Sequence, residues 1–356
     1  MLADSAAVRP LTVGVLGTSS FAGRRMVPAL HGCPDTRLAA VAGRDAARAR
    51  RTAAQWGCSS HAGYEEILSR PDIDAVYVPL PNSLHHTWVR RALHSGKHVL
   101  AEKPLTTEVH TTTELFALAA ERGLVLRENY AFEHHDRHRA ARALVEQGGI
   151  GQIRHFSSSF CIPSLPADNI RHRPDLGGGA LLDAGVYPVR AAQYFLGDEL
   201  TVAGAVLRWD PDYGVDIGGS ALLRCADGVT AALTFGFGNR YGAEYELWGS
   251  AGRLDTQHAF AVGADDVPLL RVEDEDGVRR TALDPQDQYL AVVAAFAAAV
   301  RGAQASGADP GHEVTAARAR RTAELVARIA DLARTVTEEP TREPAGAGRA
   351  GDRWRS

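Results

Sequence analysis

The sequence predicts an α/β protein in which a doubly wound parallel sheet is followed by an α+β domain with a large, mostly antiparallel open sheet. Up to about residue 129, short apolar strands alternate with helical segments, which is the pattern of parallel βαβ units. Later strand-like runs are separated by turn signals such as Ala226-Asp-Gly228, which favours antiparallel pairing. We therefore expect a first domain over 9–129, a second over 130–336, and a disordered tail over 337–356, where Pro, Gly, Arg and Glu dominate.

The composition is that of a soluble globular protein. The chain has 356 residues, of which 45% are apolar and 23% charged, and its net charge of −4 gives no reason to expect nucleic acid or an anionic membrane as partner. We find no apolar run of about 18 residues and no signal peptide at the N-terminus. Cys33, Cys58, Cys161 and Cys225 lack disulfide or metal spacing, which predicts free thiols in a reducing cytoplasm.

The first domain is expected to alternate regularly. Its predicted strands are 11–16, 37–42, 75–78, 98–101 and 124–127. Its predicted helices are 22–31, with a kink at Pro28, and 46–56, 86–95 and 108–121. Gly96 and Gly123 are expected to end the last two helices.

In the second domain, helix 136–147 precedes the predicted strands. The predicted strands are 151–160, 201–209, 220–223, 230–237, 245–247 and 269–273, and two helices, 286–301 and 313–336, follow them. His134, His135 and His138 share one helical face, so a metal site is conceivable there. Because no carboxylate or thiolate has matching spacing, we expect no metal.

A glycine turn joins the first strand to the first helix, as in a Rossmann dinucleotide-binding domain. Gly17 permits the tight turn and Ala22 lets the helix pack closely on the strand, so that the helix N-terminus faces a pyrophosphate. Ser19 replaces the middle glycine of the fingerprint, which restricts the backbone but supplies a hydroxyl for a phosphate oxygen. We expect the whole turn to contact the cofactor, namely Gly17, Thr18, Ser19, Ser20, Phe21 and Ala22.

The second strand ends at Gly43 and Arg44, where NAD-binding sites usually place a carboxylate for the ribose 2′-hydroxyl. A small residue and a guanidinium suit a 2′-phosphate, which predicts NADPH. Asp45 follows directly, and we interpret it as the cap of the next helix. The alternative for Arg44 is a solvated arginine at a helix start.

The stretch Leu100-Ala-Glu-Lys-Pro-Leu105 closes a buried strand. Pro104 ends the strand pairing because it has no N–H to donate, so Glu102 and Lys103 lie where open α/β sheets bind ligands. Only Lys97 and Lys103, among 39 Lys and Arg residues, are lysines. An ammonium with a tunable pKa is the commoner choice where protons move, so we predict that Lys103 is catalytic.

The second informative stretch is Gly177-Gly-Gly-Ala-Leu-Leu-Asp-Ala-Gly-Val-Tyr-Pro188. Its glycines let the backbone approach a ligand, and a helix begins near Leu182. Asp183 and Tyr187 are four residues apart and therefore share one helical face. The functional interpretation is a carboxylate and a phenol that face a nicotinamide; the alternative is a glycine-rich helix start with one buried tyrosine.

Together, Gly14-Val-Leu-Gly-Thr-Ser-Ser-Phe-Ala22, Ala101-Glu-Lys-Pro104 and the Gly177–Tyr187 stretch resemble the glucose–fructose oxidoreductase / inositol dehydrogenase (Gfo/Idh/MocA) family, over about residues 13–333. Many members carry His at the position of Tyr187 and a carboxylate at that of Arg190, which argues against a simple inositol dehydrogenase. Within the family, Val76-Tyr-Val-Pro-Leu-Pro81, Asp168-Asn-Ile-Arg171 and Leu233-Thr-Phe-Gly236 are similar to the sugar 3-ketoreductases of deoxysugar biosynthesis in actinomycetes.

The resemblance implies NADPH-dependent reduction of the 3-keto group of a dTDP-linked 3,4-diketo-2,6-dideoxyhexose. Tyr187 would donate the proton, and Lys103, as a nearby ammonium, would lower the pKa of that phenol. The expected catalytic residues are Lys103, Tyr187 and Asp183. Further expected cofactor contacts are Gly43, Arg44, Pro79, Leu80, Asn82, His85, Glu102 and Lys103. The expected substrate contacts are Lys103, Asn129, Arg171, Asp183 and Tyr187.

Two alternatives stay open at this point. One is an NADP-dependent oxidoreductase of the same family that acts on a free sugar or a dihydrodiol. The other is a non-catalytic regulator that senses a dinucleotide. In each case we expect a homodimer or homotetramer, because a wide open sheet in the second domain has to be covered.

Overall fold

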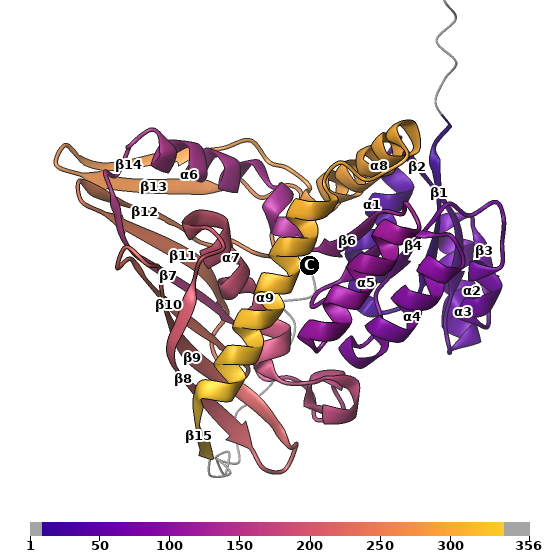
Figure 1. Ribbon diagram of the computed structural model, residues 1–356, viewed down its shortest axis with the longest axis horizontal. Helices are drawn as coiled ribbons and strands as arrows, with labels where there is room; N and C mark the ends of the chain where they lie inside the picture. Colours follow the sequence, from indigo (N-terminus) through magenta and orange to yellow (C-terminus); the bar gives the residue numbers. More distant parts are fainter. Residues whose placement is uncertain (1–8, 338–356) are drawn as a thin grey trace, which may run out of the picture.

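The computed structural model describes residues 9–337 and contains two sheets that lie beside each other (Figure 1). The first is a parallel six-stranded sheet with the order β3-β2-β1-β4-β5-β6. Its strands are β1 (Leu11–Leu16), β2 (Thr36–Ala42), β3 (Ser59–His61), β4 (Ala75–Val78), β5 (His98–Glu102) and β6 (Leu126–Asn129). The strand order reverses between β1 and β4, and such a switch point opens a crevice at the carboxyl ends of the strands.

Helices cover both faces of this sheet, which confirms the doubly wound prediction. They are a π-helical turn η1 (Ala22–Met26), α1 (Val27–Gly32), α2 (Ala46–Trp56), α3 (Tyr64–Leu68), α4 (Asn82–His94) and α5 (Val109–Glu121). Val13 and Val15 of β1 pack into the core on one face, whereas Leu16 and Val76 belong to the core on the other. Strands buried on both faces account for the short continuous apolar runs in the sequence.

The hydrophobic core on one face of the parallel sheet includes a helix from the far end of the chain. α8 (Gln288–Ser306) inserts Val292, Val293 and Phe296 into the cluster that contains Val13 and Val15. With a mean hydropathy of 1.3, it is the one helix of residues 9–337 that is long and apolar enough to cross a membrane. We expected no membrane-spanning segment; the buried apolar side chains of this helix pack on one face of the parallel sheet.

The second sheet has nine strands in the order β14-β13-β12-β11-β7-β10-β9-β8-β15. Most neighbours are antiparallel; β7 with β10 and β8 with β15 are parallel. The strands are β7 (Ile153–Cys161), β8 (Thr201–Asp210), β9 (Val215–Arg224), β10 (Thr230–Gly236), β11 (Gly242–Gly249), β12 (Gly252–Thr256), β13 (Leu269–Asp274), β14 (Gly277–Ala282) and β15 (Ala333–Thr337).

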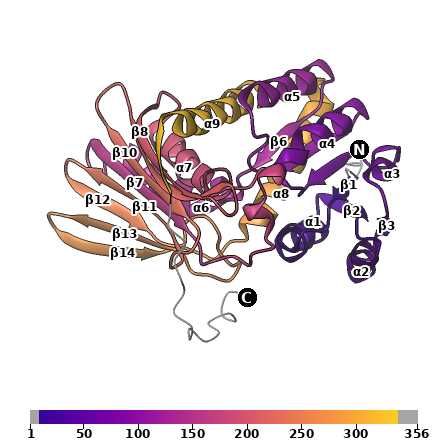
Figure 2. The ribbon, with the colours of Figure 1, turned by 90° about the horizontal axis from the view of Figure 1, so that it is seen from below.

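The helices of the second domain gather on one face of this sheet (Figure 2). They are α6 (Asp136–Glu146), α7 (Val186–Leu196) and α9 (His312–Leu332), joined by short turns η2 (Ala131–His134), η3 (Ile170–His172), η4 (Pro174–Leu176) and the π-helical η5 (Leu181–Gly185). α9 contacts α5 of the first domain as well as α7 and β8 of the second. It therefore bridges the two domains.

Several element predictions were wrong in their bounds, for local reasons. β3 and α3 escaped notice because both are short, and β14 because every residue in it is exposed. α9 ends at Leu332, and the next five residues pair with β8 as strand β15 instead of continuing the predicted helix. β6 begins at Leu126, α4 begins at Asn82, and the irregularity near Pro28 is the π-helical turn just before it. Most of the predicted tail, 338–356, lies outside the described residues.

Candidate active site

The glycine turn after β1 is shaped for a close ligand. Gly17 has φ of 138°, and a Cβ there would lie 3.2 Å from both Leu80 Cδ2 and the Pro79 carbonyl oxygen. A side chain would therefore fill the space between this turn and the end of β4. Ser19 Oγ accepts a hydrogen bond from the Ala22 amide at 3.1 Å, so the serine that replaces the middle glycine caps the following helix.

The end of β2 packs against the glycine turn. Gly43 is buried, and a Cβ on it would lie 2.9 Å from Thr18 Oγ1, so a side chain at this position would displace that of Thr18. Arg44 is exposed. Asp45 caps α2, as predicted, because its side chain accepts from the Arg48 amide at 3.0 Å. The Arg48 guanidinium lies 3.5 Å from the Thr18 carbonyl oxygen, which places a second cation beside the turn. No local sequence pattern indicates this contact.

The loop after β4 is held from behind by His85. Its Nδ1 lies 2.8 Å from the Pro104 carbonyl oxygen and its Nε2 lies 2.7 Å from that of Leu80, and the side chain is fully buried. Both ring nitrogens therefore contact backbone, so His85 positions two loops instead of touching a cofactor as we had expected. Asn82 donates from Nδ2 to the Gly177 carbonyl oxygen at 2.8 Å, which links this loop to the glycine stretch of the second domain.

At the end of β5, Glu102 forms a buried polar network with two neighbouring strands. Tyr77 donates its hydroxyl proton to Glu102 Oε1 at 2.7 Å, and Asn129 Nδ2 donates to the same oxygen at 2.6 Å. Burial raises the pKa of Glu102 above its usual value. Asn129 Oδ1 is buried and has no protein partner among the described residues, so an acceptor stands free beside Glu102. Asn129 was expected to contact substrate, and the structure places it against Glu102 and Met26.

Lys103 joins the two domains through Asp183. Its Nζ donates to the Asp183 backbone carbonyl at 2.7 Å and to Oδ1 at 3.2 Å. Arg171 Nε donates to Asp183 Oδ2 at 2.6 Å, so both carboxylate oxygens face cations. Burial alone would raise the pKa of Asp183, but the charges of Arg171 and Lys103 outweigh it and hold that pKa well below its usual range.

Tyr187 completes this group, because Lys103 Nζ lies 4.8 Å from the centroid of its ring. The predicted common face of Asp183 and Tyr187 is confirmed, since both meet the same ammonium. The expected direction of the phenol pKa is wrong: burial, joined by the charge of Glu102, raises the pKa of Tyr187 well above 10. The hydroxyl is therefore protonated at neutral pH. The glycine stretch reaches this position through the π-helical η5, which precedes α7.

The other polar residues that the sequence singled out bind to neighbouring protein groups. Arg190 is buried on α7, where its Nε donates to Glu133 Oε1 at 2.7 Å. His138 Nδ1 and Nε2 lie 3.0 Å from the Tyr245 hydroxyl and 2.9 Å from the Ala259 carbonyl oxygen. Within residues 9–337, no three His, Cys, Asp or Glu side chains are grouped to hold a metal ion.

Comparison with known proteins identifies the fold and the family. Residues 11–130 match the GFO_IDH_MocA family, described as an oxidoreductase family with an NAD-binding Rossmann fold, and residues 138–255 match the GFO/IDH/MocA C-terminal domain. The chain belongs to the Gfo/Idh/MocA family. The fold class and the family predicted from the sequence are thus confirmed.

Three relatives show how far the similarity extends. A dTDP-3,4-didehydro-2,6-dideoxy-alpha-D-glucose 3-reductase from Streptomyces violaceoruber is 50% identical over 332 residues, which are 92% of this chain and 97% of that protein. An enzyme with the same name from Actinomadura kijaniata is 48% identical over 297 residues, 83% of this chain and 90% of that protein. A D-xylose 1-dehydrogenase (NADP(+)) from Haloferax volcanii is 35% identical over 308 residues, 86% of this chain and 94% of that protein.

A solved structure is similar over most of the chain as well. The 3-ketoreductase KijD10 from Actinomadura kijaniata, in complex with NADP and TDP-benzene, superposes with a TM-score of 0.89 and 44% identity, over 93% of this chain and 100% of that one. Structures of the same enzyme with a Tyr-to-Phe or a Lys-to-Ala replacement match with TM-scores of 0.89 and 0.86.

Several residues of the site had no signal in the sequence. Tyr77 lies within an apolar strand, yet its hydroxyl donates a hydrogen bond to Glu102. Tyr289 comes from the distant helix α8, and its ring centroid lies 5.7 Å from that of Phe21. Phe160 packs its ring 4.8 Å from the Tyr187 ring, centroid to centroid. These residues meet through tertiary contacts between distant segments, which a local pattern does not encode.

Proposed function

We propose that this protein is an NADPH-dependent reductase of the 3-keto group of a dTDP-linked 3,4-diketo-2,6-dideoxyhexose. The observation that carries the proposal is the group of Lys103, Asp183 and Tyr187 at the carboxyl end of β5. Extended similarity to enzymes named for this reaction supports the choice of substrate. The test is to incubate the protein with NADPH and the dTDP-diketo sugar and to identify the product with its stereochemistry.

The residues present fit a dinucleotide. Gly17 keeps the turn after β1 free of a side chain, so a pyrophosphate can approach the backbone N–H groups at the start of the following helix. When bound, NADPH supplies the hydride. At the end of β2, Arg44 and Arg48 supply charge for a 2′-phosphate.

Residues of the chain itself supply the proton that the substrate oxygen takes up. As the ketone becomes an alcohol, its oxygen takes a proton from the Tyr187 hydroxyl, which the buried site keeps protonated until then. The Lys103 ammonium beside the ring stabilises the phenolate that remains and offers a hydrogen bond to the same substrate oxygen. Asp183 holds Lys103 in place, and Arg171 holds Asp183. Arg171 is also available to contact a substrate oxygen, since its side chain is 36% exposed.

The cofactor preference depends on the end of β2. Replacement of Arg44 by Ala is expected to weaken NADPH binding and to leave NADH binding nearly unchanged, because only NADPH carries the 2′-phosphate that a guanidinium pairs with. Fluorescence titration with both cofactors measures this difference. Arg142→Ala serves as the control, because Arg142 lies on α6 of the second domain, where it pairs with Glu146. Wild-type protein that binds NADH as tightly as NADPH would contradict our interpretation of this strand end.

A second candidate is an NADP-dependent oxidoreductase that acts on a free sugar or dihydrodiol. It is supported by the 35% identity to an enzyme named D-xylose 1-dehydrogenase (NADP(+)). A substrate panel with and without the dTDP group separates the two, since a free-sugar enzyme gains nothing from the nucleotide. A non-catalytic regulator would show no NADPH turnover with any member of the panel.

We also propose that the protein assembles through the second sheet. No helix of residues 9–337 covers the outer face (Figures 1 and 2), where Val206, Leu222 and Trp248 are 42%, 44% and 45% exposed. Exposed apolar side chains on an uncovered sheet face are typical of interfaces. Light scattering at micromolar concentration is expected to give a homodimer or homotetramer, and Trp248→Glu to shift it toward smaller species. A wild-type monomer would rule the interface out.

The cellular setting follows from the same proposal. Cys33, Cys58, Cys161 and Cys225 are all free thiols in the structure, which supports a reducing compartment, the cytoplasm. There the enzyme would act in the assembly of a deoxysugar for an antibiotic.

A further inference from the structure

The helical segment that carries Asp183 and Tyr187 begins without a cap of its own. It runs from η5 into α7, and the residue before it, Ala180, has no side-chain acceptor for the free amides of the first turn. Asp183 lies in that first turn and Tyr187 one turn later, so a shift of the helix start would move both relative to Lys103. The contacts that fix this start therefore bear on the geometry of the reaction centre.

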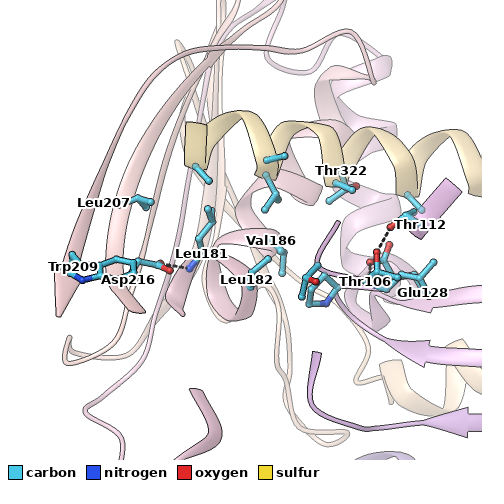
Figure 3. Close-up of a pocket in the computed structure, with 18 of the residues that line it drawn as sticks. Thr106, Thr112, Glu128, Leu181, Leu182, Val186, Leu207, Trp209, Asp216 and Thr322 are labelled. Atoms are coloured by element: carbon cyan, nitrogen blue, oxygen red, sulfur yellow. Dashed lines mark hydrogen bonds between the residues drawn. The ribbon is translucent and has the colours of Figure 1, made fainter. Parts of the chain in front are cut away.

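A carboxylate from a neighbouring strand supplies the missing cap. Asp216 of β9 accepts a hydrogen bond at Oδ2 from the Leu181 amide at 2.6 Å (Figure 3). Aspartate is a preferred residue at helix N-termini, because its oxygen satisfies a free amide and its charge suits the positive end of the helix dipole. Here the acceptor comes from a segment 35 residues further along the chain, so the helix start is tied to the second sheet.

The last two glycines before the helix allow a close approach of neighbouring segments. Gly179 has φ of 109°, and a Cβ there would lie 2.3 Å from Asp216 Oδ1. A Cβ on Gly178 would lie 2.5 Å from the Arg171 carbonyl oxygen. Glycine at 179 thus makes room for the Asp216 carboxylate at the helix start.

The surroundings of this carboxylate are largely apolar. Asp216 lies at one end of a cavity of about 370 Å³, where Leu207 and Trp209 also line the wall (Figure 3). Burial raises the pKa of Asp216 to about 6, although hydrogen bonds from the Leu181 and Ala180 amides oppose the shift. The side chain is therefore mostly ionised at neutral pH. Without it, the Leu181 amide would lose its acceptor next to an apolar lining, which is costly for a backbone donor.

We propose that Asp216 is a positioning residue of the reduction: by capping the helical segment from β9, it holds Asp183 and Tyr187 in place relative to Lys103. The inference rests on the proposed function, because the step that it supports is proton transfer from Tyr187. Asp183 and Tyr187 meet the same ammonium, so the position of their helix sets the geometry of the whole group. An offset of about 1 Å in such a group can lower a rate by about 100-fold.

The experiment compares variants with the wild type in steady-state kinetics at saturating NADPH. Asp216→Ala removes the acceptor and is expected to lower kcat by about 10- to 100-fold. NADPH affinity, measured by fluorescence titration, should not change, because the glycine turn after β1 belongs to the other domain. Asp216→Asn keeps an oxygen for the Leu181 amide and should stay within about fivefold of the wild-type kcat. Asp212→Ala, an exposed aspartate in the turn before β9, is the control and should leave kcat unchanged.

A second pair of measurements separates positioning from a purely structural role. If Asp216 acts through Tyr187, Asp216→Ala should add little to the loss in Tyr187→Phe, whereas an unrelated effect on the fold would multiply with it. Hydrogen exchange at the Leu181 amide tests the cap without any substrate, and it should be faster in Asp216→Ala but not in Asp216→Asn. If Asp216→Ala does not fold, Asp216→Val, which suits a strand and an apolar lining, replaces it.

The outcomes that overturn the inference differ from those that contradict the proposed function. Wild-type kcat in folded Asp216→Ala, multiplying losses with Tyr187→Phe, equal losses in the Ala and Asn variants, or unchanged exchange at Leu181 would each overturn the positioning role. A wild type that does not reduce the dTDP-diketo sugar contradicts the proposed function instead. The variants are then compared on the ketone that it does reduce, and the exchange measurement stands unaltered.

Discussion

Replacing Tyr187 by Phe is expected to lower the turnover of NADPH-dependent ketone reduction by about 10²–10⁴-fold, the usual cost of losing a positioned general acid. The substitution removes one oxygen and keeps the ring that packs against Phe160 and lies beside Lys103. Folding and NADPH binding should therefore survive. Stopped-flow or steady-state kinetics measure the loss, and fluorescence titration measures the retained cofactor affinity.

A matched control lies on the same helix. Tyr194 of α7 packs its ring against Phe195, outside the site, so Tyr194→Phe should turn over at the wild-type rate. Turnover near wild type in Tyr187→Phe would assign the proton to another donor, with Lys103 the nearest candidate. An equal loss in both variants would mean that the helix and not the phenol is responsible.

The pH profile adds a separate check. Because burial raises the pKa of Tyr187 well above 10, the hydroxyl stays protonated across the neutral range. Turnover should therefore show no loss from deprotonation of this group between pH 6 and about 9, in contrast to a phenol whose pKa has been lowered into that range. A fall of turnover centred near neutral pH that disappears in Tyr187→Phe would contradict the assignment.

Much of the reaction centre could be predicted because each part is local in sequence. Gly17, Lys103 and the Asp183/Tyr187 pair each follow from a strand end or a helical spacing, and the structure brings the last three together. The charge environment could not be predicted in the same way. The pKa of Tyr187 depends on its burial and on Glu102, which belongs to another segment, so a local argument gave the wrong direction.

The roles of the polar residues behind the site could not be predicted from the sequence either. Histidine is a residue type that often contacts ligands, yet both ring nitrogens of His85 face backbone carbonyls. Asn129 lies two residues beyond the predicted end of its strand and bonds to Glu102. Such assignments depend on which backbone groups remain unsatisfied after folding, and this is a property of the tertiary structure.

Replacing Lys103 by Ala is expected to cost at least as much turnover as Tyr187→Phe. Lys103 supplies the charge next to the phenol and a donor for the substrate oxygen, and it links the loop after β5 to Asp183. Lys103→Met retains the length of the side chain and removes the charge, so a comparable loss in Met and Ala variants assigns the effect to the ammonium. Restored turnover in the Met variant would assign it to packing instead.

The double variant tests whether the two residues act as one unit. Once Lys103 is gone, a Tyr187 phenolate has lost its neighbouring cation, so removal of the phenol as well should add little. We therefore expect the Lys103→Ala/Tyr187→Phe protein to be only slightly slower than the slower single variant. If the losses multiply, each residue contributes to a different step, and the Lys103 ammonium acts on the substrate oxygen without supporting Tyr187.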